Sequence, residues 1–201
     1  MIRKFKTLEP KKQFNVLLLS YFAIPVLQSI VAIVGSFTDS LPYELQKFLN
    51  TKADWIAYGF MLCTLLVIIA LLRIKEYSSN KKYMIGLTLL IVSSAISLID
   101  DVVAIPYAIR LPLNILKVII PFVGLILFMI GSPANRQVKL MAICSPIIKS
   151  IAASPLMFLL MSADIEDYQI YNIAFTGGIF AIQLAILVIM LILISKQSSE
   201  Q

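Results

Sequence analysis

The chain has 201 residues and a formal net charge of +6, with 60% hydrophobic and 14% charged residues. Soluble domains contain roughly 45–50% apolar residues, so this composition argues against an ordinary soluble domain and favours a membrane protein. The chain contains no histidine, so it lacks the usual haem ligand, the commonest zinc ligand and the usual general base. We therefore expect neither a metal nor another cofactor.

Six apolar runs follow one another along the chain, each long enough for the roughly 17–25 residues of a membrane helix. The spans are expected at about residues 14–37, 55–74, 83–105, 113–131, 138–161 and 170–195. The first run is too long for the apolar part of a signal peptide and is read as a retained span. The sequence predicts an all-α integral membrane protein, with residues 1–201 forming a single six-helix transmembrane domain. Leucines at helical spacing between the first two spans predict a short amphipathic helix at the outer surface.

Lysine and arginine are distributed unevenly between the two ends of the spans. The end that holds both termini has Arg3, Lys4, Lys6, Lys11, Lys12, Arg73, Lys75, Lys81, Lys82, Arg136, Lys139 and Lys196. The opposite end has Lys47, Lys52 and Arg110. Because cytoplasmic segments are enriched in these residues, we expect a multi-pass protein of the cell membrane with both termini in the cytoplasm. The same short basic segments explain the net charge without a nucleic-acid partner.

The two halves of the chain share a faint pattern. Pro25 in the first span and Pro121 in the fourth each precede a Gly-Ser pair at the same spacing. The third and sixth spans begin alike, with Tyr83 and Tyr171 each followed by isoleucine and threonine at matching positions. Such echoes favour a 3+3 inverted repeat, an arrangement of many transporters, and chance similarity between apolar segments is the alternative.

Polar residues inside the spans predict an intramembrane cluster. Its members are Ser97, Asp100 and Asp101 in the third span, Lys117 in the fourth, and Ser145 and Lys149 in the fifth. The sixth span adds Asn172, Thr176 and Gln183 on one helical face. The carboxylates and Lys117 fall in the outer third of the membrane, and the long stem of Lys149 can reach toward them.

Three interpretations of the cluster remain open. It can be an ion-pair network that fixes helix contacts, or the two carboxylates can be solvated at the outer interface. The third interpretation is a polar cavity open to the outside, in which a carboxylate or Lys149 exchanges protons or holds the charge of a solute.

Three prolines inside the spans predict helix kinks. Pro121 lies in the fourth span, and Pro146 and Pro155 flank Lys149 in the fifth. Proline has no N–H, so Pro146 and Pro155 leave two carbonyl groups of the fifth helix without their usual donors. Backbone groups freed at membrane depth need another partner or water.

No catalytic motif supports an enzyme. Ser145 and Lys149 stand four residues apart, but no oxyanion hole accompanies them, and the sequence has no metalloprotease, hydrolase or nucleotide-binding motif. Both cysteines, Cys63 and Cys144, lie in apolar runs, which argues against a disulfide scaffold.

Two functions are compatible with these observations. The first is a small transporter-like or channel-like protein with an outward-facing polar cluster. The alternative is a non-transporting membrane scaffold, an immunity or regulatory factor, or a subunit of a membrane complex. The expected partners are the lipid bilayer and either a second copy of the chain or another membrane protein.

Overall fold

A computed structural model describes residues 8–36, 42–102, 107–162 and 168–199. These residues form six long helices: α2 (Pro10–Ser36), α3 (Tyr43–Leu72), α4 (Lys81–Val102), α5 (Tyr107–Gly131), α6 (Arg136–Ser162) and α7 (Tyr168–Ser199). Each contains a window long and apolar enough to cross a membrane, with a mean hydropathy between 1.5 and 2.8. The predicted all-helical architecture with six membrane-spanning helices is therefore confirmed at the level of helix length and composition.

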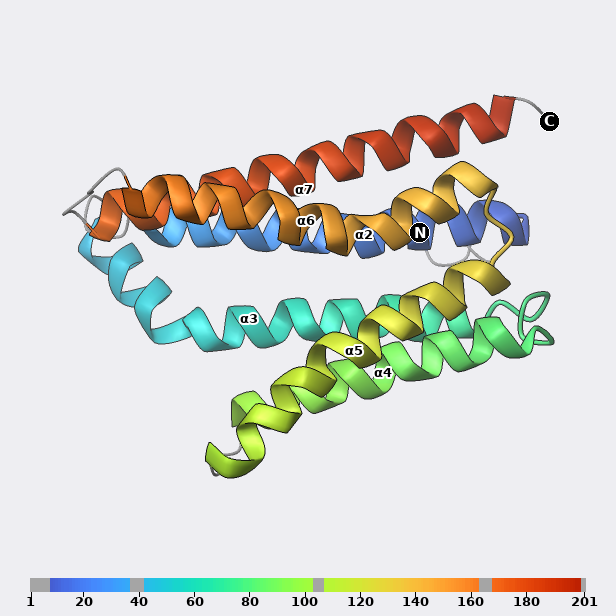
Figure 1. Cartoon of the computed structure of the whole chain (residues 1–201), viewed down its shortest axis with the longest axis horizontal. Helices are drawn as coiled ribbons and strands as arrows, with labels where there is room; N and C mark the ends of the chain where they lie inside the picture. Colours follow the sequence, from blue (N-terminus) through green and yellow to red (C-terminus); the bar gives the residue numbers. More distant parts are fainter. Residues whose placement is uncertain (1–7, 37–41, 103–106, 163–167, 200–201) are drawn as a thin grey trace.

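The second span is part of a longer helix than the sequence predicted. We expected a separate surface helix before it, but α3 runs without interruption through 30 residues from Tyr43. Pro42 precedes the first turn, where a missing N–H costs nothing, and no proline follows within the helix. Figure 1 shows the first turns of α3 bending away from the rest of the helix. The leucine side chains at positions 45 and 49 lie outside those that the structure describes.

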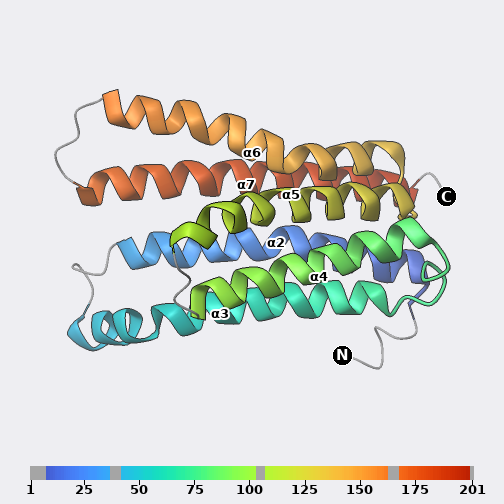
Figure 2. The ribbon, with the colours of Figure 1, turned by 60° about the horizontal axis from the view of Figure 1, so that its bottom comes forward.

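The helices form a closed ring in chain order. Each helix packs against the next, and α7 packs back against α2. The start of α2 and the end of α7 lie at one end of the bundle, together with the α3–α4 and α5–α6 links (Figure 2). We call this the terminal end. Toward the opposite end, α4 and α5 slant away from α6 and α7 (Figures 1 and 2).

The buried core lies toward the terminal end. Its fully buried large side chains are Phe14, Leu18, Ile68, Leu71, Tyr83, Leu87, Phe128, Met129, Val138 and Met190. Four aromatic rings meet there, with the Phe14 and Phe128 centroids 6.0 Å apart and those of Tyr83 and Phe128 5.3 Å apart. Tyr77 completes this group by contacting Phe14 and Tyr83. The Tyr83 hydroxyl donates to the carbonyl of Leu71 at 2.8 Å, so its polar atom is satisfied. These contacts close the terminal end of the ring.

Glycines allow α4 and α5 to approach at backbone distance. A Cβ placed on Gly86 would overlap the backbone of Phe128, and a Cβ on Gly131 would overlap the backbone of Tyr83. Small residues commonly permit such close crossings of membrane helices. Asn80 adds polar contacts, because its amide nitrogen donates to the Gly131 carbonyl at 3.1 Å while its oxygen caps α4 at the Lys82 N–H. The α4–α5 pair is therefore the most closely packed part of the ring.

The prolines lie inside continuous helices. Pro121 lies in α5, and Pro146 and Pro155 lie in α6. Figure 2 shows α6 changing direction along its length. The carbonyl of Ala142, which Pro146 deprives of its usual donor, accepts a hydrogen bond from the Ser145 hydroxyl at 2.8 Å. The side chain next to Pro146 thus supplies the partner that a freed carbonyl needs at membrane depth.

Candidate functional site

Lys149 lines a cavity of about 270 Å³ between α2, α3, α6 and α7. The wall consists of Tyr21, Phe22, Pro25, Thr64, Ser145, Pro146, Lys149, Gln183 and Ile186. We call it the Lys149 cavity. The Thr64 and Ser145 hydroxyls donate to carbonyls of their own helices. Besides the phenol of Tyr21, Lys149 and Gln183 therefore supply the remaining side-chain polar groups of a mostly apolar chamber.

A buried amide on α7 holds the Lys149 ammonium. Lys149 Nζ donates to Gln183 Oε1 at 3.0 Å, while Gln183 Nε2 donates to Ser29 Oγ at 2.7 Å and to the Pro25 carbonyl at 2.8 Å. This orientation of the amide follows from its neighbours, because the opposite orientation would place the amide N–H groups against the ammonium. Gln183 and Ser29 are each 8% exposed. The network therefore connects α2, α6 and α7 inside the membrane.

The charge of Lys149 has a neutral partner. Among the described side chains, the Lys149 ammonium bonds to the neutral amide of Gln183. The ion pair found between described side chains lies elsewhere, between Lys12 and Glu9 at the start of α2. A lysine at mid-membrane depth costs about 2.5–3.5 kcal/mol on insertion scales and is commonly paired or hydrated. Part of the Lys149 side chain is exposed at the surface of the helices. Its ammonium is thus a cationic group, bonded to a buried amide, in the wall of a mostly apolar cavity.

The structure unites part of the predicted polar cluster. Ser145 and Lys149 line the same cavity, whereas Ser97 on α4 and Lys117 on α5 are not among its lining residues. The side chains of Asp100 and Asp101 lie outside the part of the chain that the structure describes. Pairing of these carboxylates with Lys149 therefore stays a prediction.

The Ser145 and Lys149 side chains each use other partners. The Ser145 hydroxyl donates to the Ala142 carbonyl, and the Lys149 ammonium donates to Gln183. A catalytic pair would need the serine hydroxyl to donate to the lysine nitrogen. In the observed geometry the two side chains do not bond to each other, and Ser145 satisfies the carbonyl that Pro146 frees in α6.

Gln183 and Ser29 were not predicted as partners of Lys149. Gln183 belongs to the polar face expected on the sixth span, and an amide inside an apolar span requires a hydrogen-bond partner. That requirement is the signal that could have directed attention to it. Ser29 gives a weaker signal, because a serine in a membrane helix often bonds to a carbonyl of its own helix.

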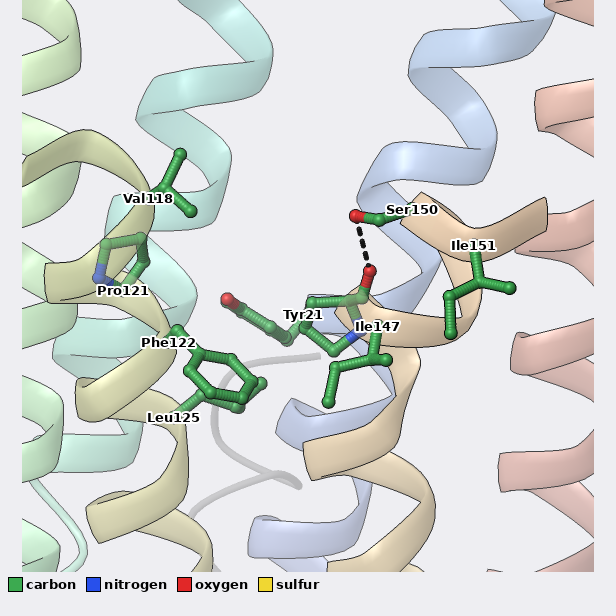
Figure 3. A pocket seen from close by; sticks show the side chains of 9 residues that line it. Tyr21, Val118, Pro121, Phe122, Leu125, Ile147, Ser150 and Ile151 are labelled. Carbon is green, nitrogen blue, oxygen red and sulfur yellow. Dashed lines mark hydrogen bonds between the residues drawn. The ribbon is translucent and has the colours of Figure 1, made fainter. Parts of the chain in front are cut away.

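A second cavity of about 480 Å³ lies between α5 and α6 (Figure 3). Its wall consists of Tyr21, Val118, Pro121, Phe122, Leu125, Pro146, Ile147, Ser150 and Ile151. We call it the α5–α6 groove. The Ser150 hydroxyl donates to the Pro146 carbonyl at 2.9 Å, so it is occupied by its own helix. The groove thus presents an almost entirely apolar surface.

Comparison with protein-family models, curated proteins and solved structures gave no match. Fold and site alone therefore define the class. The chain has the architecture of a multi-pass helical membrane protein, with a ring of six helices and a lysine-lined cavity within the helical bundle.

Proposed function

We propose that the protein is a transporter-like membrane protein that binds an anionic ligand at Lys149. The observation that carries this proposal is a lysine that lines a cavity and whose ammonium is bonded to a neutral amide. In a medium of low dielectric constant, an anion near this ammonium would gain far more electrostatic stabilisation than it would in water. Gln183 would orient the ammonium, and the apolar wall would exclude bulk water from the contact.

We also propose that both termini are cytoplasmic and that the Lys149 cavity faces the outer half of the membrane. The distribution of lysine and arginine supports this orientation. Along α6, the buried residues Val138 and Ala142 belong to the core at the terminal end, and Lys149 lies beyond them. In this orientation the core would seal the cytoplasmic side beneath the site.

The expected 3+3 inverted repeat remains part of the proposal. Exchanging α2 with α5, α3 with α6 and α4 with α7 maps every neighbouring pair of the ring onto another neighbouring pair. The α2–α7 contact, for example, corresponds to the α4–α5 contact. The order of helix contacts is thus compatible with inverted halves that meet around a central site.

Cysteine labelling tests the orientation. Ser79 is exposed in the α3–α4 link, so Ser79→Cys in a chain lacking Cys63 and Cys144 places a single thiol at the terminal end. We expect a membrane-impermeant maleimide to label this thiol only after the cells are permeabilised. Labelling of intact cells to the same extent would contradict the proposed orientation.

Transport measurements test the function. In proteoliposomes, Lys149→Met should reduce uptake of the transported carboxylate or phosphate compound by about 10–100-fold. This range corresponds to the roughly 1.5–3 kcal/mol of a hydrogen bond to a charged group. Lys81→Met removes the same charge from an exposed position in the first turn of α4 and should leave uptake unchanged.

Two results would contradict the transport proposal. One is equal uptake by wild type and Lys149→Met. The other is no uptake across a panel of carboxylates and phosphates, together with a stoichiometric membrane-protein partner after mild solubilisation. The second result would favour the alternative of a scaffold, a regulatory or immunity factor, or a complex subunit.

A further inference from the structure

The α5–α6 groove opens away from the interior of the ring. Val118 is 70% exposed, Ile151 66% and Ile147 43%, although all three line the groove. In a membrane-spanning helix, apolar side chains exposed to this degree face the acyl chains of the bilayer. Of all neighbouring helices in the ring, α5 and α6 have the least extensive contact. The groove is therefore a lateral opening toward lipid.

This apolar groove adjoins the Lys149 cavity. Tyr21 and Pro146 line both spaces. Figure 3 shows the Tyr21 ring reaching between α5 and α6, with its hydroxyl end toward α5. The groove and the Lys149 cavity thus lie on either side of a shared wall, with apolar side chains toward the bilayer and an ammonium group beyond that wall.

We propose that the ligand is an anionic membrane lipid, with an acyl chain in the α5–α6 groove and its phosphate at Lys149. This inference rests on the proposed function, in which Lys149 holds an anion. The positive charge of Lys149 complements a negatively charged headgroup, and the almost wholly apolar lining of the groove suits an acyl chain. The groove volume of about 480 Å³ lies within the roughly 300–1,000 Å³ of known ligand sites. A small free anion would make no use of the adjoining groove.

The depth of Lys149 distinguishes this lipid from those that surround any membrane protein. Lys149 lies roughly 20 Å along α6 from Arg136, at a rise of 1.5 Å per residue. The membrane window of α6 covers Arg136–Phe158. A phosphate bound at Lys149 is therefore held well inside the hydrocarbon region, as in a lipid passing between the two leaflets.

Native mass spectrometry from nanodiscs tests the inference, with phosphatidic acid diluted in phosphatidylcholine as the probe. Wild type should retain one phosphatidic acid molecule, and Lys149→Met should lower its preference over phosphatidylcholine by about tenfold or more. Lys81→Met should keep the preference. Binding of inorganic phosphate, followed by ³¹P NMR, is measured on the same samples.

A matched pair of isoleucines on α6 tests the groove. Ile147 and Ile148 are 43% and 39% exposed, but only Ile147 lines the groove. Ile147→Trp should reduce phosphatidic acid retention about tenfold and leave inorganic phosphate binding unchanged, whereas Ile148→Trp should change neither. Val118→Trp fills the groove from α5 and should also reduce phosphatidic acid retention about tenfold. It replaces Ile147→Trp in the test if the Ile147→Trp variant fails to fold.

The outcomes separate the two proposals. Lys149-dependent binding of inorganic phosphate without retention of phosphatidic acid would overturn the lipid assignment and keep the proposed function. Unchanged retention in the Ile147→Trp and Val118→Trp variants would also overturn it. If wild type retains no phosphatidic acid and binds no phosphate, the anion site itself is rejected.

Discussion

Gly86→Val is expected to lower the stability of the protein more than any other single change considered above. The added side chain would begin at a position that overlaps the backbone of Phe128, where rotation of a side chain cannot relieve the clash. Overpacking usually costs about 1–3 kcal/mol, and separation of α4 from α5 should raise the cost to about 3 kcal/mol or more. We expect a fall in Tm of about 6–12 °C, since 1 kcal/mol corresponds to about 2–4 °C at this size.

Gly59 provides the matched control for this prediction. It also lies inside a membrane helix, but a Cβ at this position has no neighbouring atom within 4 Å. Gly59→Val should leave the Tm within about 2 °C of wild type, because valine has a better helix propensity than glycine. Thermal unfolding in detergent, followed by circular dichroism, checks both variants. If Gly86→Val and Gly59→Val lower the Tm equally, the close packing of α4 against α5 does not depend on Gly86.

Lys149→Met is expected to preserve the stability of the protein, or to raise it by as much as about 2 kcal/mol, while removing ligand binding. The substitution relieves the roughly 2.5–3.5 kcal/mol cost of a charge at membrane depth. It also removes a hydrogen bond to a charged group, worth about 1.5–3 kcal/mol. The Gln183 amide keeps a partner after this change, because its oxygen can turn toward the Ser29 hydroxyl at 2.7 Å.

Removing the other partner should have the opposite effect. Gln183→Met leaves the ammonium without its hydrogen-bond acceptor, so a loss of about 1.5–3 kcal/mol is expected. The comparison decides between a binding lysine and a structural one. If Lys149→Met and Gln183→Met destabilise the protein equally, the network serves chiefly to fasten α6 to α7. The pair is compared by the same thermal unfolding measurement in detergent.

Hydropathy predicted the six spans well because long apolar runs leave few alternatives to membrane helices. It predicted the start of α3 less well. The residues before Trp55 are too polar to count as membrane-spanning, yet they continue the same helix from Tyr43. A helix can pass from a polar to an apolar environment while its backbone hydrogen bonds continue unchanged. Hydropathy therefore predicted two separate segments where the structure has the single helix α3.

The candidate site was predicted in part. An isolated lysine in an apolar run indicated a functional position, and Lys149 does line a cavity. Depth along the membrane normal suggested the carboxylates and Lys117 as neighbours of Lys149, and this stays a prediction because the side chains of Asp100 and Asp101 lie outside the described residues. The ring places α6 beside α7, which brings Gln183 to Lys149. A search for partners of opposite charge also passes over a neutral amide that can accept the same hydrogen bond.

The proline positions were more informative. The sequence indicated that Pro146 frees the carbonyl of Ala142, and this carbonyl does have a side-chain partner. The partner is the adjacent Ser145, which had been grouped with the polar cluster. Ser145 lines the Lys149 cavity, but its hydroxyl is bonded to the Ala142 carbonyl of its own helix.

We propose that Lys149 faces a cavity that is accessible from the outer side of the membrane. Thiol labelling of Lys149→Cys, in a chain lacking Cys63 and Cys144, measures this access. A membrane-impermeant anionic methanethiosulfonate added to intact cells should modify this thiol. Ala142→Cys, at a position that is 0% exposed on the same helix, should stay unmodified. Protection of Lys149→Cys equal to that of Ala142→Cys would show that position 149 is closed to the outer side.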